Sequence, residues 1–192
     1  MKKYLSLCSA FAFACILTSC EKPASTPKVE DTKKVAEEHN DAKFSAAKEA
    51  NAQFLVDAAA MDLEIVKLGE LAQTNGKMPD VKKLGEMMKM NHAGSLKNLQ
   101  ALASAKQVTL PTAITNGGQA TYDKIMAKKG VAFDKDYCNT MVSMHKNAVE
   151  KFEKANVSVS DADIIAWAET MLPALRTHLD AAITCEKKCE KM

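Results

Sequence analysis

The sequence has 192 residues and a formal net charge of +2, and 47% of its residues are apolar although only 5% are aromatic. Alanine, leucine and methionine are prominent among the apolar residues, so the composition favours packed helices over a sheet. The length suggests one domain plus a targeting segment, and the lack of any long basic run excludes a polybasic surface for nucleic acid or anionic lipid.

The first twenty residues have the pattern of an export signal. Lys2 and Lys3 precede an apolar run from Leu5 to Leu17, which is too short for a permanent membrane-spanning helix. The run ends in Leu-Thr-Ser-Cys, which resembles the bacterial lipobox, with Cys20 as the residue that would carry the lipid. We therefore expect residues 1–19 to be a lipoprotein signal peptide. An ordinary signal peptide, or a free cysteine near one, is the alternative.

The next segment reads as a spacer between this anchor and a folded domain. Residues 21–29 contain two prolines and small polar residues, which is typical of a disordered tether. Residues 30–48 are charged and weakly amphipathic, and they indicate either a marginal helix with His39 on a solvated face or a simple spacer. We expect residues 20–48 to form a lipidated tether and charged helix, held at the periplasmic face of the outer membrane. Removal of Lys2 and Lys3 would leave the mature chain with no net charge.

The rest of the chain shows apolar residues at helical spacing. Four long helices and one short helix are predicted, with the short one third in order: 51–74, 79–105, 119–129, 134–156 and 161–185. Gly76 is expected to end the first in a left-handed conformation, Asp134 and Asp161 to cap the last two, and Pro173 to bend the final helix. These elements predict an all-α helical bundle over residues 49–187 and a polar tail over 188–192.

Several stretches resemble a bacterial envelope family. They include VKKLGEMMKMNH, GVAFDKDYCNTMVSMHKNAVEKFEKA and WAETMLPALRTHL, and together the similar stretches cover roughly Val35 to Cys185. The chain resembles the domain-of-unknown-function family numbered four-one-four-two, especially its Bacteroidetes-type lipoproteins. The resemblance implies a ferritin-like antiparallel four-helix bundle with a short extra helix and an outer-membrane address. The family has no established activity, so the resemblance implies no reaction.

One set of residues could bind a metal ion. Glu64, His92, His145 and His178 lie one on each long helix, on or near its apolar stripe, and imidazole with carboxylate suits Zn, Fe, Mn or Cu. The alternative is that each histidine bonds a backbone carbonyl or a neighbouring carboxylate. Folding the last two helices about residues 157–160 would place His145 and His178 roughly 10 Å apart along the axis, too far for one ion. No histidine has a glutamate three residues before it, as a di-iron site would need. We therefore expect no cofactor, with a metal site as the less favoured alternative.

Three cysteines lie in the predicted bundle or just beyond it. The family resemblance implies that Cys138 and Cys185 form a disulfide, which export would permit. The simple register leaves this pair roughly 9 Å apart, beyond the reach of a disulfide unless the helix bends or the turn is longer. A Cys138–Cys189 disulfide and free thiols are the alternatives.

The sequence therefore favours a lipid-anchored helical-bundle protein of the cell envelope with a binding or structural, stress-related role. The membrane is the expected partner, through the lipid, and no nucleic-acid partner is expected, whereas the sequence leaves a protein partner or small ligand unidentified. A ferritin-like metal-binding or redox protein is the alternative. No Gly-rich phosphate loop and no nucleophile motif of a hydrolase is present in the sequence, so catalysis is not favoured.

Overall fold

The computed structural model describes residues 31–192, and the only regular structure in this part of the chain is helical. The signal peptide, the tether before residue 31 and Cys20 lie outside it. The seven helices confirm the all-α prediction; they are α1 (Thr32–Asp41), α2 (Ala46–Asn75), α3 (Pro79–Ala105), α4 (Asn116–Met126), α5 (Gly130–Glu153), α6 (Ala155–Ser158) and α7 (Ala162–Glu190).

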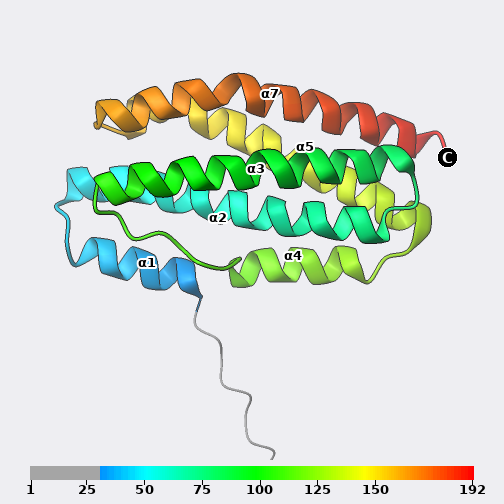
Figure 1. The fold of residues 1–192 in the computed structure, drawn as a ribbon, viewed down its shortest axis with the longest axis horizontal. Coiled ribbons are helices and arrows are strands. Elements are labelled where there is room, and N and C mark those ends of the chain that lie inside the picture. Colours follow the sequence, from blue (N-terminus) through cyan, green and yellow to red (C-terminus); the bar gives the residue numbers. More distant parts are fainter. Residues whose placement is uncertain (1–30) are drawn as a thin grey trace, which may run out of the picture.

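Two long hairpins form the body of the structure, α2 with α3 and α5 with α7 (Figure 1). The segment from residue 106 through α4 returns along the length of the bundle before α5 begins (Figure 1). Because of this return, α3 and α5 run in the same direction, and so do α2 and α7. Contacts of α3 with α7 and of α2 with α5 join the two hairpins into one helical bundle.

The α2–α3 turn is held from a distance. Pro79 opens α3, as expected at the first position of a helix. The prediction that Asp134 caps α5 is wrong, because α5 begins at Gly130. The wholly buried Asp134 carboxylate instead accepts hydrogen bonds from the backbone amides of Lys77 (2.8 Å) and Met78 (2.9 Å). Asp134 therefore satisfies amides of the α2–α3 turn and ties it to α5.

Two glycines behave differently from the sequence-based expectation. Gly76 ends α2 with φ −57° and ψ 135°, so the predicted left-handed cap is wrong, because the chain extends there towards Pro79. The positive φ lies instead at Gly130 (59°), where α5 begins. A glycine is also required where α2 and α3 cross, since a Cβ on Gly69 would lie 2.6 Å from the carbonyl oxygen of Gly85.

Helical structure continues further after α5 than the sequence predicts, so the turn before α7 comes later in the chain. The short helix α6 prolongs α5 to Ser158, with Ala155 and Val159 buried against the bundle. The turn therefore falls at residues 159–161. Asp161 caps α7 by accepting from the amides of Asp163 and Ile164, as predicted, and α7 continues through Pro173.

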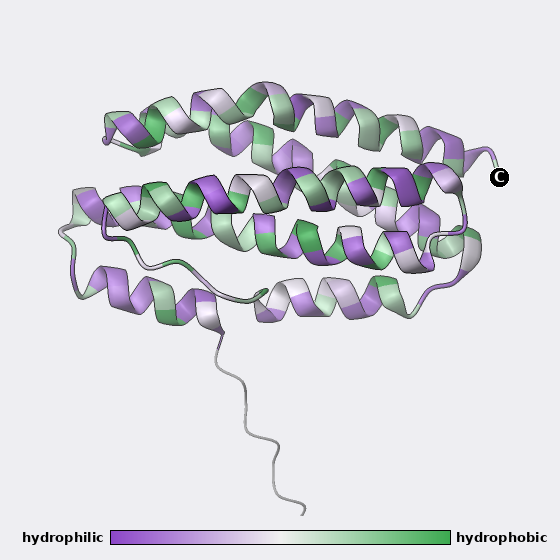
Figure 2. Cartoon of the chain, viewed as in Figure 1, coloured by the Kyte–Doolittle hydropathy of each residue, from purple (hydrophilic) through white to green (hydrophobic). Residues whose placement is uncertain are grey.

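The long helices are amphipathic, with hydrophilic and hydrophobic residues alternating along each (Figure 2). Their buried apolar residues fall into two clusters. One contains Ile65, Met88 and Met141, and the other contains Ala58, Leu99 and Ala148. At the far end of α7 the helix runs past the expected boundary at residue 187 to Glu190, and it buries Cys189.

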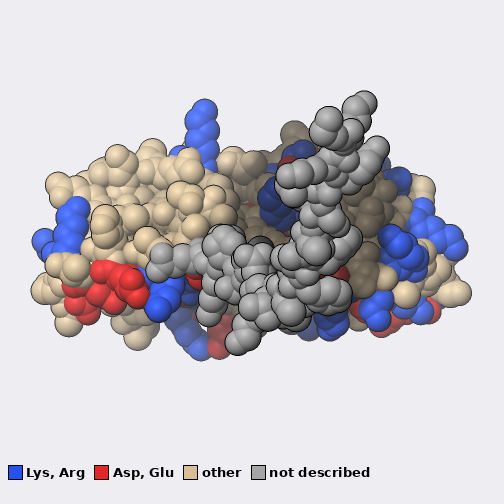
Figure 3. Space-filling model, turned by 90° about the horizontal axis from the view of Figure 1, so that it is seen from below, with Lys and Arg blue, Asp and Glu red and all other residues tan. Residues whose placement is uncertain are grey.

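Helices α1 and α4 lie along the outside of the bundle. Asn40 at the end of α1 donates to the carbonyl of Thr109 and accepts from its amide, both at 2.9 Å, while His39 is exposed as expected. The face that carries α1 and α4 shows basic side chains interspersed with acidic ones and with uncharged areas (Figure 3). None of the helices in residues 31–192 is both long and apolar enough to cross a membrane.

Candidate metal site

A buried polar layer crosses the bundle between the two apolar clusters. It consists of Asp62 on α2, His92 on α3, His145 on α5 and His178 on α7, one residue from each long helix. None of these side chains belongs to the apolar clusters, and none is more than 4% exposed. Buried ionisable groups are unfavourable unless they find partners, so their shared position needs a physical account.

The three imidazoles are close together. The ring centroids of each pair lie 5.1–5.4 Å apart, and one ring nitrogen from each histidine can be chosen so that all three lie within 4.8 Å of one another. The expected separation of roughly 10 Å between His145 and His178 is therefore wrong. The reason is α6, which extends the helical structure to Ser158, so that the turn falls at residues 159–161 rather than 157–160 and residues further along α7 face His145.

The hydrogen bonds of two histidines fix where their protons lie. His145 Nδ1 lies 2.8 Å from the carbonyl oxygen of Met141, and His92 Nδ1 lies 2.7 Å from Asp62 Oδ1. The carbonyl oxygen can only accept a hydrogen bond, and the same holds for the Asp62 oxygen when that carboxyl is ionised. Each Nδ1 then carries a proton, and each ring, when neutral, has its lone pair on Nε2. These two Nε2 atoms are 3.2 Å apart. Two lone pairs at this distance repel, unless an added proton or a metal cation lies between them.

The third histidine also has an unsatisfied nitrogen. His178 Nε2 lies 2.9 Å from Nδ2 of Asn91, whereas His178 Nδ1 is buried and has no hydrogen-bond partner within residues 31–192. Oδ2 of Asp62 is similarly unpartnered in this part of the chain. As the amide stands, Asn91 Nδ2 donates to His178 Nε2 and the ring proton lies on Nδ1; with the Asn91 amide turned over, its oxygen would accept from Nε2–H and the free lone pair would lie on Nδ1. Asp62 Oδ2 and the two facing Nε2 atoms of His92 and His145 therefore leave acceptor capacity in the layer that the described residues do not satisfy.

The environment keeps two of the rings neutral. Burial, with the nearby His92, lowers the pKa of His145 to about 3 and the pKa of His178 to about 4. Both rings therefore have an available lone pair at neutral pH, as metal ligation requires.

Glu64 does not join this layer. Its half-buried carboxylate lies on the side of α2 covered by α4, where a Cβ on Gly118 would be 3.1 Å from Glu64 Cδ. Burial there raises the pKa of Glu64, against the opposing effect of a hydrogen bond from Thr121. Asp62, two residues earlier, supplies the carboxylate instead. Neither Asp62 nor Asn91 was predicted from the sequence, although Asp62 lies four residues after Ala58 and three before Ile65, on the buried stripe.

A second group of potential ligands lies at the end of the bundle. Cys138, Cys185 and Cys189 are buried and are free thiols, so the predicted Cys138–Cys185 disulfide is not formed. Their Sγ atoms nevertheless lie within 4.8 Å of one another, because the register that aligns His145 with His178 also aligns Cys138 with Cys185.

A family model described as "Domain of unknown function (DUF4142)" matches residues 34–184. The chain belongs to the DUF4142 family. The match confirms the resemblance found in the sequence, and it includes the whole polar layer of Asp62 and the three histidines. Comparison with curated proteins found no match, and neither did comparison with solved structures.

Proposed function

We propose that this DUF4142 protein binds one divalent transition-metal ion in its polar layer, with His92, His145 and His178 as ligands. The observation that carries the proposal is the 3.2 Å separation of two Nε2 atoms whose own Nδ1 protons are already donated elsewhere. A cation between these lone pairs would turn a repulsive contact into two coordinate bonds.

The distances and donor types suit zinc or another ion that prefers imidazole. Two nitrogens bound tetrahedrally at 2.0–2.1 Å from a metal lie about 3.3 Å apart, close to the observed separation. Asp62 would act through His92, because a carboxylate that accepts from the far nitrogen of a ligating imidazole orients the ring and increases its basicity. The same layer offers one carboxylate where a di-iron centre uses several, so it fits a mononuclear site better.

The arrangement of the long helices supports a ferritin-like four-helix bundle as the architecture of this site. Two hairpins joined by one long connection are characteristic of that fold, and its metal sites lie in the core between facing helices. The three imidazoles are at most 4% exposed, so a substrate could reach a bound ion only if the bundle opened. This enclosure supports holding a metal ion rather than turning over a substrate.

We also propose that the protein is anchored in the bacterial cell envelope by lipid at Cys20, facing the periplasm. This rests on the lipobox-like sequence before Cys20. Replacing Cys20 by alanine is expected to move the protein from the membrane pellet to the soluble fraction, measured by fractionation and immunoblotting. The matched control is Cys15→Ala, within the proposed signal peptide, which should leave the protein in the pellet. Retention of the Cys20→Ala protein in the pellet would contradict the anchor.

Metal content is the direct test of the proposed site. Protein prepared without a metal-affinity tag, incubated with zinc and then desalted, is expected to hold about one zinc per chain by elemental analysis. His145→Ala should lose it, because only two imidazoles remain, whereas the exposed His39→Ala should keep it. Less than a tenth of an equivalent in the unaltered protein, or equal zinc in the His145→Ala protein, would refute the proposal.

A further inference from the structure

Four sulfur atoms meet where α5 begins and α7 ends. The Sγ atoms of Cys138 and Cys189 are 3.8 Å apart, and Sγ of Cys189 lies 3.6 Å from Sδ of Met78 at the start of α3. Cys185, one turn before Cys189 on α7, completes the group, with all three Sγ atoms within 4.8 Å of one another. We call Cys138, Cys185 and Cys189 the thiol cluster. Its members come from two helices and share one buried position.

We propose that the thiol cluster binds one monovalent copper ion through its three thiolates, with the Met78 thioether beside them. Soft sulfur donors select monovalent copper, and no imidazole belongs to the cluster. Sulfur atoms about 2.3 Å from a shared metal lie about 3.8–4.0 Å apart, which matches the Cys138–Cys189 distance. A disulfide would need about 2.05 Å.

The binding step needs no electron transfer. Each copper–sulfur bond forms as a thiol loses its proton to solvent, and the copper remains monovalent throughout. The hydroxyl of the wholly buried Tyr137, which packs in the same buried cluster as the three cysteines, has no hydrogen-bond partner in residues 31–192. A negatively charged thiolate cluster would give this donor a favourable environment.

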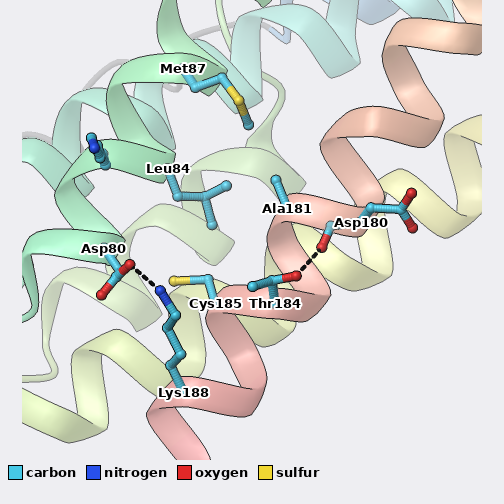
Figure 4. A pocket seen from close by; sticks show the side chains of 9 residues that line it. Asp80, Leu84, Met87, Asp180, Ala181, Thr184, Cys185 and Lys188 are labelled. Atoms are coloured by element: carbon cyan, nitrogen blue, oxygen red, sulfur yellow. Dashed lines mark hydrogen bonds and ion pairs between the residues drawn. The ribbon is translucent and has the colours of Figure 1, made fainter.

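The cluster is open to a surface pocket on one side. A pocket of about 500 Å³ lies between α3 and α7, and Cys185 and Met87 both line it (Figure 4). An ion pair between Asp80 and Lys188 crosses its edge (Figure 4). An ion in this pocket can contact Met87 and Cys185, which both line it, whereas Cys138 and Cys189 are more deeply buried. The pocket therefore supplies an entry route that the polar layer lacks among its own residues.

The two proposed sites are separate. Cys138 precedes His145 by seven residues, and Cys185 follows His178 by seven, so about two helical turns, or roughly 10 Å, divide the levels. One metal ion cannot bridge them. The thiol cluster therefore stands independently of the histidine site, and each can fail without the other.

The test is a competition for monovalent copper. The full chain, extracted in mild detergent without oxygen, is titrated against monovalent copper held as its coloured bicinchoninate complex. We expect about one equivalent to be withdrawn, with a thiolate-to-copper absorption band in the ultraviolet. Cys138→Ser and Cys189→Ser should each weaken binding by more than about 100-fold, since a direct ligand should matter more than an outer-shell partner. Circular dichroism establishes that each variant is folded.

His145→Ala is the matched control, and it should bind copper as tightly as the unaltered chain. Three results would overturn the proposal: no withdrawal of copper by the unaltered chain, unchanged affinity in folded Cys138→Ser and Cys189→Ser, or displacement of the copper by equimolar zinc. Loss of copper in His145→Ala would also overturn it, because the histidines would then be the binding site.

Discussion

Replacing Asp62 by asparagine is expected to weaken zinc binding by about 10- to 100-fold, because such losses follow removal of a carboxylate that supports a ligating imidazole. Asp62 Oδ1 lies 2.7 Å from His92 Nδ1, and both side chains are buried. Asparagine has nearly the same shape and can still accept this hydrogen bond, but it lacks the negative charge that makes the imidazole a stronger donor. Competition with a coloured zinc chelator measures the change in affinity.

Glu64→Gln is the matched control for this prediction. It removes a carboxylate from the same helix two residues away, and Glu64 is the carboxylate that the sequence offered as a candidate ligand. Since Glu64 lies against Gly118 and Thr121 rather than the histidines, its replacement should leave zinc affinity unchanged. If Glu64→Gln weakens binding and Asp62→Asn does not, the arrangement of the polar layer described above is wrong.

Replacing Asp134 by alanine is expected to lower the free energy of unfolding by about 3–6 kcal/mol, because each of two hydrogen bonds to a charged group contributes about 1.5–3 kcal/mol. The carboxylate accepts from two backbone amides of the α2–α3 turn, and alanine would leave both without this partner. Asp134→Asn retains one acceptor, so its free energy of unfolding should fall between those of the unaltered protein and Asp134→Ala. Urea unfolding followed by circular dichroism gives the difference.

Asp136→Ala serves as the control on the same helix, because its half-buried carboxylate makes no hydrogen bond or ion pair within residues 31–192. Its cost should be within about 0.5 kcal/mol, as for most surface substitutions. A loss below about 1 kcal/mol for Asp134→Ala would mean that water replaces the carboxylate at these amides, and that Asp134 does not hold the turn.

Helical periodicity was enough to predict the class of fold and the bounds of α3, and the capping residue Asp161 was enough to predict where α7 begins. The apolar stripes, Pro79 and Asp161 are all local signals. It was not enough to predict the site. Asp62 and Glu64 differ by about 200° around α2, yet each lies three or four residues before a buried apolar residue, Ile65 for Asp62 and Leu68 for Glu64, so spacing alone does not choose between them. The packing of α4 against α2 covers Glu64, and this contact depends on the course of residues 106–115, which no local pattern specifies.

The register of α5 against α7 was the second feature that the sequence did not predict. Residues 155–158 are Ala-Asn-Val-Ser, which predicts a turn as readily as a last helical turn. Burial of Ala155 and Val159 against the rest of the bundle favours the helix, and this is a tertiary effect. The later turn, at residues 159–161 rather than 157–160, changes the expected pairing of His145 and His178 from separated to adjacent.

The three-residue turn at 159–161 thus sets the phase of α7 relative to α5 for the histidines and the thiol cluster together. One residue inserted into α7 between its cap Asp161 and His178 would rotate the rest of the helix by about 100° and advance it by about 1.5 Å, which would take His178, Cys185 and Cys189 away from their neighbours in a single step. A residue inserted in the connection at 106–115 would not have this effect, because that connection precedes both helices of the hairpin. A change in length is therefore compatible with both sites in the long crossover and incompatible with them in the first half of α7.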